Sequence, residues 1–559
     1  MEVYENGVCV RLGQNEFRGQ GGEGAVYVRQ NKAYKVYSDP TRALPKGKLQ
    51  ELLPLSRPCI VKPETLLTDK AGGAVGYTMQ AIGTGIPLCQ VFPKAFRDRH
   101  QFTPARALAL VERLRDGVQH VHDCGILIVD LNEMNFLVTP DLRDLYFIDV
   151  DSYQTAHFGA TAIMESIRDR HASRFSCETD WFSFAVVSFQ VLVGIHPYKG
   201  KHPQLKTLDE RMQANVSVLN KHVSIPPVCV PLSTLPPLWR DWYRAVFDDG
   251  KRVAPPNGIA TALAFVPTIT VAAAASGPLQ MRLLHTFDGS VLEMTGDCVL
   301  TTKAVYKAGR RIGGVPNGSL SIPRLVVVPG ANVPLLAFLD GGQVRLQNAQ
   351  TGDDVPCTLW ADDLMTTEGR LYLKQNGALL ETALLPTAKN LLVSTRPAAN
   401  VLEQATQLFD GVAVQNLLGA WYVSLPVRTG VCQQIRVAEW DGCRVVDARY
   451  ENGVLVAVTE RAGQYDRHVL RFDATGKRRD CRTTSNVEST DIDFTVLDTG
   501  VCLLLDGETL EVFGAAPGDA RVTEVQDASL GGGRLLSDGA QALLARNHEL
   551  FAIRMGSAP

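Results

Sequence analysis

Residues 125–138 read GILIVDLNEMNFLV, and they place Asp130 and Asn135 five positions apart between two apolar runs. A second run, LYFIDVDSYQ (145–154), places Asp149 at the end of a hydrophobic strand, fourteen positions after Asn135. The spacing of Asp130 suits a base that accepts the proton of an attacking hydroxyl, while Asn135 and Asp149 offer the oxygen ligands that Mg²⁺ prefers. An Asx turn that ends a strand explains the first run alone, but not the second.

A glycine-rich segment lies upstream of these runs. Residues 19–26 read GQGGEGAV, which fits the pattern G-x-G-x-x-G-x-V through Gly19, Gly21 and Gly24 and also contains Gly22 and Val26. Glycines here would let backbone amides close over phosphate groups. An ordinary glycine-rich turn explains the segment equally well, so it decides nothing by itself.

Lys35 follows Gly24 by eleven positions, in the strand-like stretch AYKVY. Its apolar neighbours alternate with it, so its ammonium would project toward whatever the glycine loop covers, and a buried ammonium needs an anionic partner. Phosphate oxygens and a carboxylate on a helix would supply one. Glu51 in KLQELLPL is the candidate carboxylate, although Pro45 and Gly47 would shorten that helix, and a solvated surface glutamate is the alternative.

Two charged residues further along are interpreted as structural. Asp180 opens an apolar helix, where it acts either as the N-cap, the default interpretation, or as an acceptor for backbone amides of the loop around Asp130. Arg252, in FDDGKRVAPP, either forms an ion pair among the helices or is a plain surface arginine.

The order of elements in the first half is strands followed by helices. Short segments rich in Val and Tyr at 9–36 and 76–79 predict a small antiparallel sheet. Apolar residues every three or four positions at 108–121, and an almost continuous apolar run at 182–193, predict two core helices.

The character of the chain changes after about residue 266. Alternating segments joined by DGG, QNG, ENG or DGE turns predict serial hairpins over residues 281–559, after a linker at 267–280. This pattern suits an all-β domain, a β-propeller of six or seven blades at about 40 to 45 residues each, and two β-sandwiches are the alternative. Nothing in this half has catalytic spacing, and His468 is interpreted as a packed strand residue.

Composition excludes several classes of protein. A net charge of −3 over 559 residues gives no electrostatic footprint for nucleic acid. The twelve cysteines form no C-x-x-C pair, which indicates reduced thiols in a cytosol. The chain begins without a basic segment followed by an apolar core, and no apolar run approaches about 18 residues. We therefore expect a cytoplasmic protein that neither inserts into membranes nor is secreted through a cleavable signal.

Taken together, these features resemble the eukaryotic-like protein kinase family over about 250 residues. The features that carry this resemblance are, in chain order, the glycine loop, Lys35, Asp130, Asn135, Asp149, Asp180, HPYKG (196–200) and Arg252. More narrowly, DLNEMNFLV, IDVDSYQ, TDWFSFAV and GIHPYKG resemble the bacterial signalling kinases of the tellurite-resistance-associated phosphorylation triad. Members of that group are associated with a PP2C-type phosphatase and a von Willebrand factor A protein.

The resemblance implies an α+β bilobal kinase-like domain at 1–266, with an N-lobe at about 1–82 and a C-lobe at about 83–266. It implies ATP and Mg²⁺ as cofactors and transfer of the γ-phosphoryl group to Ser or Thr hydroxyls of protein substrates. Asp130 would be the catalytic base, Lys35 and Glu51 the catalytic ion pair, and Asn135 and Asp149 the magnesium ligands. The hinge that reads adenine would lie at Met79, Gln80 and Ile82.

Departures from the family pattern limit what carries over. Ile128 and Val129 replace the usual His and Arg before the catalytic Asp, so this would be a non-RD kinase without the arginine clamp on a phosphorylated activation loop. Asn132 replaces the usual Lys, which predicts slow turnover. Val150 and Asp151 replace the Phe and Gly of D-F-G, and no A-P-E occurs between residues 155 and 178.

Three functions therefore stand at this point. The first is an active Ser/Thr kinase whose C-terminal β domain recruits substrates or regulators. The second is a nucleotide-binding pseudokinase that serves as a scaffold, which Ile128, Val129 and Asn132 favour. The third is a small-molecule phosphotransferase, against which TDWFSFAV and GIHPYKG argue.

Overall fold

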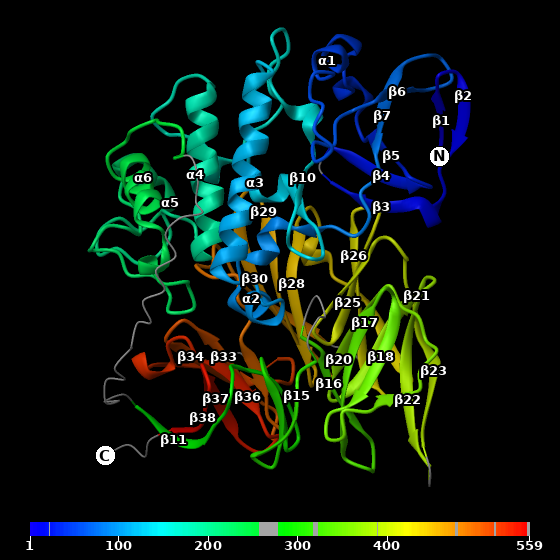
Figure 1. The fold of residues 1–559 in the computed structure, drawn as a ribbon, viewed down its shortest axis with the longest axis vertical. Helices are drawn as coiled ribbons and strands as arrows, with labels where there is room; N and C mark the ends of the chain where they lie inside the picture. Colours follow the sequence, from blue (N-terminus) through cyan, green and yellow to red (C-terminus); the bar gives the residue numbers. More distant parts are fainter. Residues whose placement is uncertain are drawn as a thin grey trace.

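The structure is a computed structural model that describes residues 1–21, 23–256, 278–316, 322–387, 390–473, 475, 479–518 and 521–555. A small sheet comes first in the chain, then a helical region, then an all-β region that forms the lower part of the molecule in Figure 1. The predicted boundary at 266 and the linker up to residue 277 lie outside the described residues. The first strand after them begins at Leu279, two positions before the predicted start.

Seven antiparallel strands form the N-terminal sheet, in the order β2-β1-β6-β7-β5-β4-β3. They are β1 Glu2–Glu5, β2 Val8–Arg11, β3 Phe17–Gln20, β4 Gly24–Arg29, β5 Lys32–Tyr37, β6 Thr65–Thr68 and β7 Ala74–Gln80. Side chains alternate between the two faces of the sheet along each strand, and on β5 both faces are buried. On β5, Tyr34 and Val36 belong to one apolar cluster, while Lys35 and Tyr37 point to the other face. The predicted small antiparallel sheet is confirmed.

Helices dominate the next part of the chain. They are α1 Lys46–Glu51, α2 Lys94–Arg99, α3 Pro104–Asp123, α4 Cys177–Val193, α5 Leu208–Ala214 and α6 Pro237–Phe247. A three-stranded sheet of β8 Ile86–Pro87, β9 Phe136–Val138 and β10 Leu145–Phe147 packs beside them.

Short 3-10 helices occur in all three regions of the chain. They are η1 Gln14–Glu16, η2 Pro40–Arg42, η3 Leu88–Val91, η4 Glu133–Asn135, η5 Val150–Ser152, η6 Glu165–Ile167, η7 Leu232–Thr234, η8 Ala438–Trp440 and η9 Ala528–Leu530.

The two predicted core helices are confirmed, and local sequence explains their ends. Helix α3 begins at Pro104 because the Thr103 hydroxyl accepts the Arg106 amide and proline suits the first helical position. Helix α4 is buried from Asp180 through Val193, as its apolar sequence requires, and it stops at Gly194, which has a left-handed φ of +86°.

The all-β region contains seven four-stranded antiparallel sheets within the described residues. Six are built from consecutive strands: β12 Val291–Thr295, β13 Cys298–Thr301, β14 Ala304–Lys307, β15 Arg310–Gly314; β16 Arg324–Val328, β17 Val333–Asp340, β18 Gln343–Asn348, β19 Asp354–Val355; β20 Asp363–Thr367, β21 Arg370–Gln375, β22 Ala378–Pro386, β23 Leu391–Asn400; β24 Thr406–Phe409, β25 Val412–Leu417, β26 Ala420–Arg428, β27 Val431–Arg436; β28 Arg444–Glu451, β29 Val454–Arg461, β30 Gln464–Phe472, β31 Arg479–Thr484; and β32 Phe494–Val496, β33 Val501–Asp506, β34 Thr509–Gly514, β35 Val522–Gln526.

The seventh sheet joins the two ends of the region. It combines β11 Leu279–Thr286 with β36 Arg534–Ser537, β37 Ala542–Arg546 and β38 Glu549–Met555. The predicted hairpin turns are confirmed: at the ENG turn between β28 and β29, Asn452 and Gly453 both have positive φ, as a two-residue type I′ turn requires. The all-β prediction for the second half is therefore confirmed.

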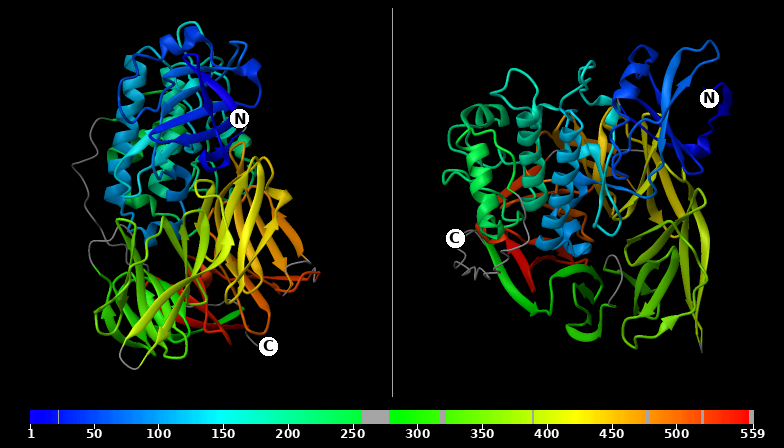
Figure 2. Two further views of the ribbon diagram at one scale, coloured as in Figure 1. Left: turned by 90° about the vertical axis from the view of Figure 1, so that its right-hand side faces the viewer. Right: turned by 45° about the horizontal axis from the view of Figure 1, so that its top comes forward.

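The helical and all-β regions pack directly against each other. One buried cluster includes Leu110 and Phe184 of helices α3 and α4 together with Val446, Val458 and Tyr465 of the sheet β28–β31. Figure 2 shows this sheet, drawn in orange, against the helical region. All twelve cysteines lie in the described part of the chain and are free thiols. Among the described residues, no helix is both long enough and apolar enough to span a bilayer.

Candidate functional site

The glycine-rich segment forms the hairpin between β3 and β4. The Gly21 amide donates to the Gly24 carbonyl at 2.9 Å. A Cβ added at Gly24 would lie 2.3 Å from the backbone oxygen of Val36, so glycine lets β4 approach β5 closely. A Cβ at Gly19 or Gly21 would meet no atom within 4 Å, so open space remains beside this hairpin. Gly22 lies outside the described residues.

Lys35 lies on the face of the N-terminal sheet that is directed toward Asp149. Its cross-strand neighbours are Val26 on β4 and Tyr77 on β7, so the three side chains share one face. Lys35 is only 6% exposed, and its ammonium lies 5.7 Å from the centre of the Tyr77 ring. The prediction that Lys35 projects inward from a strand is confirmed.

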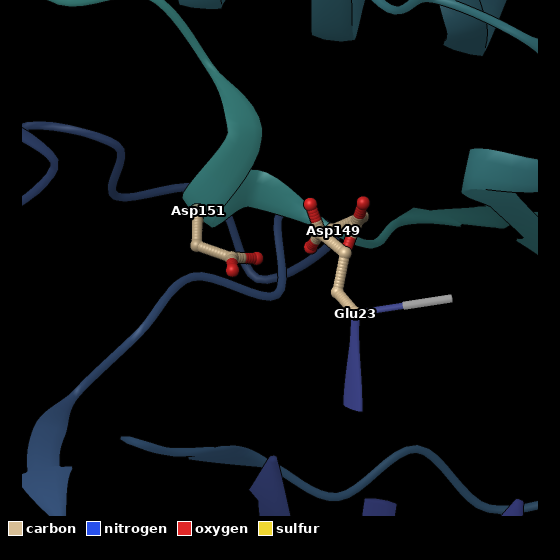
Figure 3. Close-up of side chains that lie close together, drawn as sticks. All are labelled: Glu23, Asp149 and Asp151. Carbon is tan, nitrogen blue, oxygen red and sulfur yellow. The ribbon is translucent and has the colours of Figure 1, made fainter. Parts of the chain in front are cut away.

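Three carboxylates surround the Lys35 ammonium, and Figure 3 shows how they lie together. Lys35 Nζ is 2.6 Å from Asp149, 2.9 Å from Asp151 and 3.1 Å from Glu23. Ligand oxygens of the three carboxylates lie within 4.8 Å of one another. Three negative charges against one positive charge leave these four side chains with an excess of two negative charges. Such a cluster favours a cation beside it.

Asp151 is the most deeply buried of the three carboxylates that contact Lys35. It is 5% exposed, and its two oxygens accept from the Tyr37 and Tyr77 hydroxyls at 2.6 Å each in addition to the Lys35 ammonium. From the sequence, Asp151 stood out only as a replacement for the glycine of D-F-G, and this role was not predicted. The available signal was Tyr37, which lies two positions after Lys35 on the same strand and therefore on the same face.

Burial and nearby charges shift the pKa values of Asp149 and Asp151 in opposite directions. Burial alone would raise the pKa of Asp151, but the Lys35 ammonium and the tyrosine hydroxyls outweigh it and hold that pKa below the usual value. The pKa of Asp149 is raised by burial, which its contact with Lys35 only partly offsets. The three carboxylates in turn raise the pKa of Lys35 against the effect of burial, so it remains an ammonium.

Glu51 does not pair with Lys35, contrary to the sequence prediction. Among the described residues, no ion pair joins the two, and the Glu51 carboxylate instead contacts the His157 ring at 2.6 Å. Helix α1 has only six residues, which fits the expected effect of Pro45 and Gly47. Lys48 is the buried charged residue of this helix. Asp151 takes the place predicted for Glu51.

Asp130 and Asn135 are brought together by the loop before β9. The Asn135 side-chain amide donates to the Asp130 backbone oxygen at 2.9 Å and lies 3.3 Å from its carboxylate. The other Asp130 oxygen accepts the Met164 amide at 2.8 Å. These contacts fix the Asp130 carboxylate and use the side-chain nitrogen of Asn135, so the amide oxygen takes no part in them.

Asn135 also lies beside the Asp149 segment. Phe136 pairs with Phe147 across β9 and β10, and the Ile148 amide donates to the Asn135 carbonyl at 3.0 Å. Asp149 follows with a left-handed φ of +62°, an uncommon backbone conformation for a residue other than glycine. The two predicted metal ligands therefore come from adjacent segments.

Asp180 holds the loop that precedes Asp130, and the N-cap interpretation is wrong. Ser176 is the N-cap of α4, and Asp180 lies within the first turns, fully buried. Its carboxylate accepts the Ile128 amide at 2.8 Å and the Val129 amide at 2.9 Å. Val129 has a φ of +63°, which is strained for a β-branched residue, and strain of this kind persists where surrounding contacts impose it.

Arg252 forms an ion pair, and the surface alternative is wrong. Its guanidinium binds both oxygens of Asp169, at 2.5 and 2.7 Å, and lies 4.6 Å from the centre of the Phe182 ring. This pair ties the end of the helical region to the segment that follows η6. Arg252 therefore has a structural role.

The predicted hinge lies at the end of β7. Met79 is the next to last residue of the strand and is half-buried, Gln80 is exposed and Ile82 is half-buried in the following loop. The Arg18 guanidinium, on β3, donates to the backbone oxygen of Gly83 at 2.8 Å. This contact ties the glycine-rich hairpin to the start of the loop.

Comparison with known proteins adds no family. No protein-family model matches the chain, and no curated protein matches it. The arrangement itself supplies a fixed carboxylate at Asp130, an amide oxygen at Asn135, an ammonium at Lys35 and an excess of carboxylates beside it. These groups suit the binding of a divalent cation with a polyphosphate and the removal of a proton from a hydroxyl.

Proposed function

We propose that this chain is an ATP- and Mg²⁺-dependent protein kinase that transfers the γ-phosphoryl group to Ser or Thr hydroxyls. The observation that carries the proposal is the ion pair of 2.6 Å between Lys35 and Asp149, which are 114 positions apart in the chain. Kinase chemistry needs these two groups beside the phosphates of the nucleotide and a carboxylate base beside the acceptor hydroxyl. Asp130, joined to Asn135, is that base.

We also propose an architecture for each half of the chain. The seven-stranded sheet and the helices after it would be the small and large lobes of a kinase-like fold, with the hinge after β7. The all-β region would be a β-propeller of seven blades, because β36 contacts both β32 and β12, and β11 completes the sheet of β36–β38. The closing sheet, which joins the first strand of the region to its last three, favours a ring over two β-sandwiches.

ATP and Mg²⁺ fit the residues present. The open space beside Gly19 and Gly21 leaves room for phosphate groups near backbone amides. Asp149, with the amide oxygen of Asn135, would hold the magnesium ion, and the excess negative charge of the Lys35 cluster favours that cation. Bound Mg²⁺ would neutralise phosphate charge. The protein residues then orient the phosphates through Lys35 and accept the hydroxyl proton at Asp130.

A pseudokinase scaffold is the second candidate, and one observation favours it. Asn132, which replaces the usual Lys, is buried and its side-chain oxygen accepts the Met134 amide at 2.8 Å. It therefore caps the loop and supplies no positive charge to a transferring phosphoryl group. The resemblance to the bacterial signalling kinases also implies a PP2C-type phosphatase and a von Willebrand factor A protein as partners. These two proteins are the first acceptors to test in a phosphorylation assay.

The test is phosphoryl transfer from labelled ATP with Mg²⁺ by wild type, Asp130→Ala and Asp149→Ala, offered protein and small-molecule acceptors. Asp130→Ala loses the general base, which lowers transfer by about 10²- to 10⁴-fold. Asp149→Ala loses a magnesium ligand, so both variants should transfer almost nothing. Asp116→Ala is the matched control, since that side chain is 52% exposed on α3 and contacts its neighbour Arg115. Wild type that binds ATP but transfers nothing supports the scaffold, and labelled small molecules alone support the third function.

A further inference from the structure

The sheet β28–β31 of the all-β region contacts the loop between Asp130 and Asn135. Tyr465, on β30, donates its hydroxyl to the Glu133 carboxylate. Glu133 lies in η4 between the two site residues and is 1% exposed. Its second oxygen is buried without a hydrogen-bond partner among the described residues. The Tyr465 hydroxyl is therefore the side-chain donor on which this buried carboxylate depends.

A second contact reaches the neighbouring residue of the same loop. The Arg444 guanidinium, at the start of β28, donates to the Met134 backbone oxygen at 3.4 Å. Close by, the Gln90 side-chain amide of the helical region donates to the Val446 backbone oxygen at 2.9 Å. Two consecutive residues of the loop, 133 and 134, are thus held by the all-β region.

A third contact reaches Asp130 from the opposite side, through the segment before η6. Gly463, in the turn between β29 and β30, has a φ of +80°, and a Cβ there would lie 2.4 Å from Ser166 Oγ and 2.9 Å from Met164. Met164 donates its amide to the Asp130 carboxylate at 2.8 Å. The turn therefore packs directly against the residue that orients Asp130.

These contacts lie within a buried apolar interface between the helical and all-β regions. Val446, Val458 and Tyr465 lie in the same buried apolar cluster as helices α3 and α4. Lys199 of the helical region donates to the Val487 backbone oxygen at 2.6 Å, and its ammonium lies 5.6 Å from the centre of the Tyr465 ring. An apolar interface with buried polar contacts does not behave as a flexible tether between domains.

We propose that Tyr465 is a positioning residue for phosphoryl transfer, which acts through Glu133 to fix the loop that holds Asp130 and Asn135. This inference rests on the proposed function. The all-β region is then part of the catalytic machinery, in addition to any recruiting surface. Positioning matters because a small displacement of a base lowers the rate steeply.

The test compares Tyr465→Phe with Tyr306→Phe in the full chain. Tyr306, on β14, is also buried, and its hydroxyl accepts the Asp288 amide at 2.8 Å. Each variant loses one buried tyrosine hydroxyl, but only the first faces the loop. Tyr465→Phe should lower kcat by at least about tenfold with KM for ATP nearly unchanged, while Tyr306→Phe should keep both.

A readout independent of activity is hydrogen exchange of residues 125–138. Exchange in this segment should rise in Tyr465→Phe and remain unchanged in Tyr306→Phe. Gly463→Ala is the second variant, expected to act like Tyr465→Phe because its Cβ meets Ser166. Its control is Gly419→Ala, at which φ is also positive, +86°, but a Cβ meets no atom within 4 Å.

The outcomes separate this inference from the proposed function. Wild type that transfers no phosphate refutes the proposed function, and increased exchange confined to residues 125–138 in Tyr465→Phe then still supports the positioning contact. Active wild type with unchanged kcat and unchanged exchange in Tyr465→Phe overturns the positioning role alone. A higher kcat in Tyr465→Phe overturns it as well, because the contact would then restrain the enzyme.

Discussion

Replacement of Asp151 by asparagine tests which carboxylate holds Lys35. The aspartate accepts four hydrogen-bond contacts from Lys35, Tyr37 and Tyr77, at 2.6 to 3.0 Å, and is almost fully buried. An asparagine at this position would present one oxygen and one donor to surroundings that consist of donors, so about half of these contacts are lost. Breaking a buried ion pair from one side costs about 3 to 5 kcal/mol. Because Asp149 and Glu23 still contact the ammonium, we expect the lower end, about 3 kcal/mol.

The matched control is Glu51→Gln, which removes the carboxylate that the sequence predicted for this role. The His157 partner of Glu51 is 80% exposed, so this substitution should leave the Tm nearly unchanged. Thermal unfolding measures the Tm of both variants, and calorimetric titration with ATP and Mg²⁺ measures their nucleotide affinity. We expect this affinity to fall about tenfold in Asp151→Asn and to remain unchanged in Glu51→Gln. If Glu51→Gln lowers ATP affinity as much as Asp151→Asn does, or if Asp151→Asn leaves the Tm unchanged, the assignment of the Lys35 partner is wrong.

Three further variants test other parts of the structure. Asp180→Asn leaves a loop amide without its acceptor and should cost about 2 kcal/mol in unfolding experiments and lower phosphoryl transfer, while an unchanged Tm would contradict the role of this carboxylate. Arg252→Ala strips Asp169 of a bidentate partner and should destabilise the helical region by about 3 kcal/mol, with Arg244→Ala, which is half-exposed on α6, as the neutral control. Burial, with help from the nearby charge of Asp410, raises the pKa of Asp447 to about 8. The folded chain therefore binds a proton that the unfolded chain releases above about pH 4, and stability falls as pH rises toward 8. Asp447→Asn removes this loss, so its Tm should exceed that of wild type by more at pH 8 than at pH 4.5, and equal differences at both pH values would refute the protonated state.

Local patterns in the sequence were enough to predict the two long helices, the small N-terminal sheet and the hairpins of the second half. The apolar period of residues 108–121 predicted helix α3, and the DGG, QNG, ENG and DGE turns predicted hairpins of the all-β region. These predictions succeeded because the signals lie within one element. Side-chain periodicity sets the buried face of a helix, and turn residues need particular values of φ and ψ whatever surrounds them.

The site was predicted in part. Spacing picked out Lys35, Asp130, Asn135 and Asp149, and the structure brings the first and last of these into contact. Spacing did not pick out Asp151, because the tertiary fold decides which carboxylate lies beside a buried ammonium. Glu51 is the last residue of the six-residue helix α1, and its carboxylate contacts His157 instead.

The sequence by itself determined the two long helices, the small N-terminal sheet, the serial hairpins and the residue types that carry the proposed chemistry. Only the tertiary structure decided the partners across long separations: Asp151 for Lys35, the loop amides for Asp180 and Tyr465 for Glu133. The last pair is 332 positions apart in the chain. Such contacts depend on how preformed elements pack, and the sequence spacing of two residues carries no information about that packing.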